Sequence, residues 1–89
     1  MRLTLFTPHR QLRAVECDSV RLPVADSVSG KYSGSYGIRK GHAKAIFSLT
    51  EGKVSASLNG KEVFTAGCNG GFATVENDDV RVVADGIKE

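Results

Sequence analysis

The sequence predicts an all-β fold, a small antiparallel β-sandwich or flattened barrel of about ten short strands in a single domain. Three observations support this prediction. The chain has 89 residues, enough for one compact core. Its apolar residues alternate with polar residues or form short runs, and turn-forming residues interrupt them at short spacing. No stretch shows the apolar period of an amphipathic helix.

The first part of the chain contains three predicted strands and a long connection. Leu3–Thr7 alternates apolar and polar side chains, and the next residue is a proline, which cannot donate to a β-ladder. Gln11–Glu16 has a weaker strand pattern, and Ser19–Leu22 again ends before a proline. Small and polar residues dominate the next stretch of the chain, so we predict that Val24–Gly37 is one long, mobile connection.

Five more strands are predicted in the second half. Asn59–Gly60 gives the strongest local signal, because both residues tolerate the positive φ of a type I′ hairpin turn. Glu51–Gly52 and Asn77–Asp78 mark two further turns. The strands predicted around these turns are Lys44–Thr50, Lys53–Leu58, Lys61–Ala66, Phe72–Val75 and Val80–Ala84.

Apolar residues of these strands form the predicted core. Gly70 and Gly71 precede Phe72, and paired glycines permit a bulge or a close approach of two sheets. We therefore expect Phe72 to fill the core and expect no chemistry there. The other predicted core residues are Leu3, Leu5, Val20, Leu22, Ile46, Leu58, Val75, Val80 and Val82.

The stretch Tyr32–Ala43 combines glycines, tyrosines and several basic side chains. Glycine allows sharp turns without a Cβ clash, so we predict a surface loop from which Tyr36, Arg39, Lys40 and His42 point outward. This loop is the predicted working surface.

The overall composition is that of a soluble globular protein. The net charge of +2 is too weakly basic to indicate nucleic-acid binding by itself. Two cysteines are too few for a disulfide scaffold, and no signal sequence follows Met1, so we expect an intracellular protein with reduced thiols. Because no apolar window is long enough to cross a bilayer, we expect membrane association only through a partner.

Catalytic and metal chemistry have little support in the sequence. Cys17, Cys68, His9 and His42 are isolated from one another, whereas zinc ligands usually come in closely spaced pairs. The same isolation argues against a Cys–His catalytic pair. The glycine-rich stretch lacks the string and the helix of a phosphate-binding P-loop. We predict no catalytic residue, no metal and no cofactor.

Two other interpretations of the basic Tyr32–His42 loop remain open. In a small nucleic-acid-binding β-barrel, its basic side chains would contact phosphates while Tyr32 and Tyr36 stack on bases. Alternatively, the loop is only a solvated connection.

Five segments of the chain have the order and nearly the spacing of the motifs of one family, and together they span essentially the whole chain. On these segments the chain resembles the amino-terminal β-sandwich domain of the epsilon subunit of rotary F-type ATP synthases. The segments are Leu3–Pro8, Val20–Pro23, Gly34–Ala43 with its Gly-His-Ala end, Gly70–Val75 and Val80–Asp85.

The resemblance implies a rotor subunit of the central stalk that couples the c-ring to the gamma subunit during ion-driven ATP synthesis. Such a subunit is not an enzyme and needs no cofactor. It would sit peripherally at the cytoplasmic face of the bacterial inner membrane. The resemblance, together with the chemistry of the loop, assigns the c-ring and gamma interface to Ser35, Tyr36, Arg39, Lys40 and His42.

The chain also departs from the family pattern. Arg39, Lys40 and Lys44 stand where Leu, Pro and Pro are common, and Ser35 stands where an acidic residue is usual. We therefore expect the ring that it meets to carry an acidic polar loop. Residues 1–89 match the β-sandwich domain, and the C-terminal helical hairpin of fuller members is absent, so we expect coupling without helix-mediated regulation.

Overall fold

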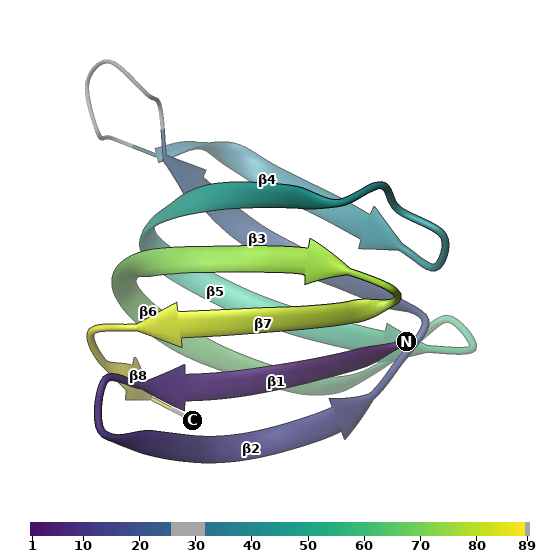
Figure 1. Cartoon of the computed structure of the whole chain (residues 1–89), viewed down its shortest axis with the longest axis horizontal. Coiled ribbons are helices and arrows are strands. Elements are labelled where there is room, and N and C mark those ends of the chain that lie inside the picture. Colours follow the sequence, from purple (N-terminus) through teal and green to yellow (C-terminus); the bar gives the residue numbers. More distant parts are fainter. Residues whose placement is uncertain (26–31, 89) are drawn as a thin grey trace.

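The computed structural model describes residues 1–25 and 32–88, with only the backbone described for Tyr32 and Ser33. Every regular element in these ranges is a β-strand, which confirms the all-β prediction (Figure 1). The strands are β1 (Arg2–Thr7), β2 (Arg10–Glu16), β3 (Ser19–Ala25), β4 (Tyr32–Arg39), β5 (Ala45–Leu58), β6 (Lys61–Glu76), β7 (Asp79–Ala84) and β8 (Ile87–Lys88).

The strands form one continuous sheet that folds over itself into two layers (Figure 1). The first layer contains β2, β1, β7 and the adjoining halves of β6 and β5, residues 71–76 and 45–49. The second layer contains the other halves of β6 and β5, then β3 and β4, with β8 beside β6. All neighbouring strands are antiparallel except β1 and β7, which pair in parallel.

Two long strands replace four of the predicted short ones. Glu51 and Gly52 lie inside β5, so the predicted turn is wrong there, and Gly70 and Gly71 lie inside β6. Gly70 and Gly71 have φ values of 108° and 134°, which let β6 change direction without ending. The described residues therefore form eight strands rather than about ten.

The turns that join β5 to β6 and β6 to β7 match the sequence prediction. Asn59 and Gly60 have φ values of 55° and 80°, as a type I′ turn requires. Asn77 and Asp78 have φ values of 51° and 60°, so the second hairpin uses the same kind of turn. Asn and Asp adopt positive φ more readily than other non-glycine residues do, because their short polar side chains can hydrogen-bond locally.

The predicted loop over Tyr32–Ala43 is wrong for most of its length. Residues 32–39 form β4, which pairs with β3 from Ala25↔Tyr32 to Ser19↔Arg39. Only residues 40–44 form a loop. The centre of the predicted long connection, residues 26–31, lies outside the described residues.

The core between the layers contains most of the predicted residues. Leu3, Leu5, Val20, Leu22, Val75, Val80 and Val82 are all buried, and Ile38 of β4 joins them. Leu58 is only half-buried. Ile46 and Phe72 were predicted as core, but they are 74% and 47% exposed because they lie on the outer side of their strands.

Aromatic contacts close both open corners between the layers. At one corner, the guanidinium of Arg13 on β2 lies 5.0 Å from the ring centre of Phe64 on β6, a cation–π contact. At the other, the rings of Tyr36 on β4 and Phe47 on β5 lie 4.7 Å apart. Each contact joins an edge strand of one layer to a strand of the other.

The buried thiol of Cys17 should make the free energy of unfolding depend on pH at high pH. Burial raises the pKa of Cys17 and outweighs the opposing charge of the N-terminal amine. Below the ordinary thiol pKa of about 8.5, both the folded and the unfolded chain keep the proton. Above it the unfolded chain ionises first, so the free energy of unfolding falls until the folded-state pKa is passed.

We therefore expect the stability difference between wild type and Cys17→Ala to shrink as the pH rises from about 8 to about 10. Urea unfolding of both proteins at several pH values measures this difference. Titratable groups that the two proteins share contribute equally to both and therefore cancel in the difference. An unchanged difference across this range would contradict the prediction.

Candidate functional site

The five predicted site residues lie on β4 and on the loop that follows it. Ser35 is exposed on β4, where it pairs with Pro23 of β3. Tyr36 is also exposed on β4, and Arg39 ends the strand. Lys40 and His42 belong to the loop, which a backbone hydrogen bond from His42 N to Arg39 O tightens into a turn. The structure therefore gathers these residues along one strand and its end.

Tyr36 and His42 form a small aromatic cluster with Phe47. The Tyr36 hydroxyl lies 3.0 Å from His42 Nε2, and His42 Nδ1 lies 2.7 Å from the carbonyl oxygen of Ala43. In the neutral ring, Nδ1 donates to this carbonyl and Nε2 accepts from the tyrosine hydroxyl. The Tyr36 ring thus packs on Phe47, and its hydroxyl is hydrogen-bonded to His42. These contacts leave the ring poorly placed to stack on a nucleic-acid base.

An acidic turn holds the other side of this loop. The Gly41 backbone N–H donates to Asp78 Oδ1 at 2.7 Å, and the Lys44 ammonium lies 3.8 Å from a Glu76 carboxylate oxygen. Sequence reasoning missed this contact because Asp78 is 37 positions away from Gly41. The loop is therefore less basic in the folded protein than its sequence suggests, because acidic side chains lie beside it.

Arg39 and Lys40 are the exception. Within residues 1–25 and 32–88, neither side chain forms an ion pair, and both are exposed. They line a shallow pocket with Asp18, Ser19, Ser57 and Gly60. In the predicted Tyr32–His42 loop, the unpaired positive charge therefore belongs to Arg39 and Lys40.

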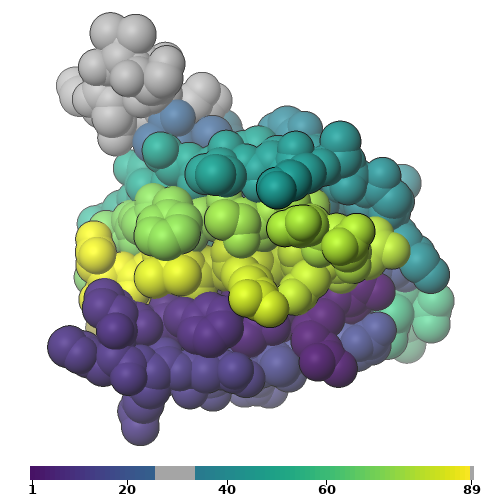
Figure 2. Space-filling view, viewed as in Figure 1, coloured from purple at the N-terminus to yellow at the C-terminus, as the bar shows by residue number. Residues whose placement is uncertain are grey.

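A second surface, whose residues sequence reasoning did not identify, covers the outer face of the first layer (Figure 2). Strand register places Phe6, Val83, Phe72 and Ser48 side by side across β1, β7, β6 and β5. The neighbouring row contains Thr4, Arg81, Thr74 and Ile46 in the same strand order. We call this surface, defined by Phe6, Ile46, Phe72 and Val83, the apolar face.

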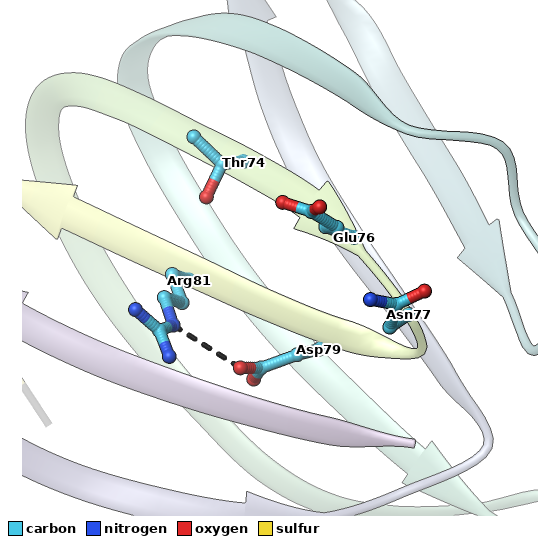
Figure 3. A pocket seen from close by; sticks show the side chains of 5 residues that line it. All are labelled: Thr74, Glu76, Asn77, Asp79 and Arg81. Atoms are coloured by element: carbon cyan, nitrogen blue, oxygen red, sulfur yellow. Dashed lines mark hydrogen bonds and ion pairs between the residues drawn. The ribbon is translucent and has the colours of Figure 1, made fainter.

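Charged residues border the apolar face near the β6–β7 turn (Figure 3). Arg81 Nε donates to Asp79 Oδ2 at 3.1 Å, and these two residues line a shallow polar pocket with Thr74, Glu76 and Asn77. Thr74 and Arg81 also belong to the row that contains Ile46. The face therefore combines an apolar centre with a polar margin, as protein–protein interfaces do.

The opposite outer face is different in character. On the second layer, Ser19, Ser55 and Ser57 alternate with buried residues along β3 and β5. A polar outer face suits contact with water, whereas clustered aromatic and aliphatic groups on the first layer favour burial by a partner.

No group of three His, Cys, Asp or Glu side chains that could hold a metal ion occurs in the described part of the chain. Cys17 and Cys68 are both buried, and the Cys68 thiol contacts the Thr50 carbonyl at 3.6 Å. Among the residues that the structure describes, no helix is long and apolar enough to span a bilayer.

Comparisons with known proteins point to one family. Residues 1–89 match the model of the ATP synthase, Delta/Epsilon chain, beta-sandwich domain. The chain is 33% identical over 85 residues to the ATP synthase epsilon chain of Paracoccus denitrificans (strain Pd 1222), covering 96% of this chain and 53% of that protein. The epsilon chain of Anaeromyxobacter sp. (strain Fw109-5) is also 33% identical over 85 residues, with 58% of its length covered. The chain thus spans little more than half of these relatives.

A solved structure shares the fold at lower sequence identity. It is a chain of the cryo-EM structure of the central stalk and c-ring of the Tetrahymena thermophila mitochondrial ATP synthase. The TM-score is 0.70 at 12% identity, and the match covers 99% of the present chain and 65% of the other. This similarity supports the arrangement of strands described above.

Proposed function

Because the chain belongs to the family of the ATP synthase Delta/Epsilon chain β-sandwich domain, we propose that it couples the c-ring to the gamma subunit in the central stalk of a rotary ATP synthase. In this role the domain transmits rotation and catalyses no reaction of its own. Its two separate surfaces, the apolar face and the charged end at Arg39 and Lys40, support the proposal. A coupling element needs two adhesive surfaces on a stiff body.

The apolar face carries the proposal, and we assign it to the gamma subunit. Ile46 and Phe72 keep 74% and 47% of their surface exposed in the isolated chain, although apolar burial stabilises proteins. Exposed aromatic and aliphatic side chains that cluster on one sheet mark a protein contact more often than isolated ones do. Their position on strands of a well-packed sandwich also presents them rigidly.

The end that holds Ser35, Tyr36, Arg39, Lys40 and His42 is assigned to the polar loops of the c-ring. Arg39 and Lys40 supply its free positive charge, and Tyr36 and His42 hold the adjoining turn in shape. An acidic ring loop would complement these charges and make the contact sensitive to salt. With this orientation the domain lies at the cytoplasmic face of a bacterial inner membrane, bound through its partners.

Reversing the two free charges tests this arrangement. We expect Arg39→Glu/Lys40→Glu to weaken association with the c-ring by about tenfold or more at low salt, because attraction becomes repulsion. The complex with an isolated gamma subunit should be unchanged. Pull-down with reconstituted c-ring and co-purification with gamma, each at several salt concentrations, measure the two contacts separately.

Lys53→Glu provides a matched control, because Lys53 is an exposed lysine in the middle of β5 and outside the proposed contact. Equal loss of ring binding in this control would show a general charge effect and argue against the assigned site. Absence of any gamma complex with the wild-type protein would overturn the coupling role itself.

A further inference from the structure

The shallow pocket beside Arg39 and Lys40 has the chemistry of an anion site. Register places Arg39, Ser19 and Ser57 next to one another across β4, β3 and β5. Val20 and Ala56, their neighbours along the chain, point into the core, so these side chains lie on the outer side of the second layer. Lys40 and Gly60 complete the rim together with Asp18.

The acidic residue of this pocket is already engaged. Asp18 Oδ2 accepts a hydrogen bond from the Asn59 backbone N–H at 2.9 Å, and the Asp18 backbone N–H donates to Ser57 O at 2.9 Å. These bonds fix the β5–β6 turn against the start of β3. The Asp18 carboxylate therefore holds the turn in place, and one of its oxygens is already hydrogen-bonded to the backbone.

The donors of the pocket are not engaged in the same way. In the described part of the chain, the side chains of Arg39, Lys40, Ser19 and Ser57 make no hydrogen bond or ion pair with protein groups. By contrast, Lys44 and Arg81 are paired with Glu76 and Asp79 at the β6–β7 turn. A guanidinium, an ammonium and two hydroxyls thus line the pocket beside the Asp18 carboxylate, and none of the four is bonded to it.

We propose that this pocket binds a phosphate group. A phosphate offers several acceptor oxygens at once, so it can take a forked bond from Arg39, a charge contact from Lys40 and hydroxyl bonds from Ser19 and Ser57. A single carboxylate has fewer oxygens and would leave part of this set unused. The site does not depend on the coupling role proposed above.

The phosphate group has two possible sources, free phosphate and the headgroup of a phospholipid. If the charged end faces the ring, as the proposed function holds, the pocket lies near the membrane surface and a headgroup is the expected source. This choice of source rests on the proposed function, whereas phosphate binding by the isolated domain does not.

Titration of the isotope-labelled protein with inorganic phosphate tests the site. At constant ionic strength, we expect saturable NMR shifts of the backbone amides of Ser19, Lys40, Ser57 and Gly60. Arg39→Gln/Lys40→Gln should weaken this binding by about tenfold or more, because it removes both charged donors. Lys44→Gln/Lys53→Gln, which removes two exposed charges that do not line the pocket, should leave it unchanged.

Co-sedimentation with vesicles distinguishes the sources. Vesicles of phosphatidylcholine with phosphatidic acid should bind the protein and release it when inorganic phosphate is added, if the source is a headgroup. If the protein binds inorganic phosphate but not the vesicles, the phosphate site stands, but a phospholipid headgroup is not its ligand. Shifts that fail to saturate, or that are the same in Arg39→Gln/Lys40→Gln, would overturn the site.

Discussion

Gly71→Ala is expected to destabilise the domain more than any other single change discussed here. A Cβ at Gly71 would clash with the carbonyl oxygen of Val83 and lie 2.8 Å from the Ala84 Cα, and the backbone φ of 134° is unfavourable for alanine. Both obstacles involve backbone, which cannot rotate away. We expect a loss of at least about 3 kcal/mol, a large share of the stability of a small domain.

In a thermal melt, this loss corresponds to a fall in Tm of at least about 12 °C. Gly67→Ala is the matched control, because it lies in the same strand, has no positive φ, and its Cβ would meet only the Lys88 carbonyl oxygen at 3.7 Å. It should change Tm by only a few degrees. Equal melting of the two variants would show that the close approach at Gly71 is not a real constraint.

Phe72→Asp is expected to break the proposed complex with the gamma subunit while leaving the fold intact. A buried aromatic at the centre of an interface commonly contributes several kcal/mol, and a carboxylate in its place would be desolvated without a partner. We expect affinity for the isolated gamma subunit to fall at least about thirtyfold. Calorimetric titration or surface binding measures the affinity, and thermal unfolding measures the fold.

Val63→Asp is the control for this experiment. Val63 is 44% exposed, close to the 47% of Phe72, but it lies in the half of β6 that belongs to the second layer. The same change there should leave gamma binding intact. If both variants bind gamma as wild type does, the apolar face is not the gamma contact, and if both lose binding, the loss is not specific to that face.

Local turn chemistry and strand alternation predicted much of this fold. Asn59–Gly60 defined its hairpin because the turn type depends on two residues only, and both have positive φ. Breaks between strands were harder to predict. Gly52 suggested a turn, yet it lies inside β5, where a Cβ would come within 2.6 Å of Pro23. Its small size serves contact with another strand, which local sequence does not reveal.

The surfaces were harder to predict than the core. Alternation shows that one side of a strand is apolar, but Ile46 and Phe72 belong to strands with apolar groups on both sides. Sequence reasoning placed them inside because it could not tell a core contact from a partner contact. The Tyr32–Arg39 strand was missed because its glycines suggested a loop, whereas pairing with β3 overrides this local preference.

The continuity of β5 and β6 through both layers has a mechanical consequence. In a sandwich whose layers touch only through side chains, sliding one layer over the other disrupts packing but stretches no backbone. Here two hydrogen-bonded strands pass from one layer to the other and pair along most of their length. A sideways force on either layer therefore pulls on covalent backbone, so the domain resists shear as one solid piece.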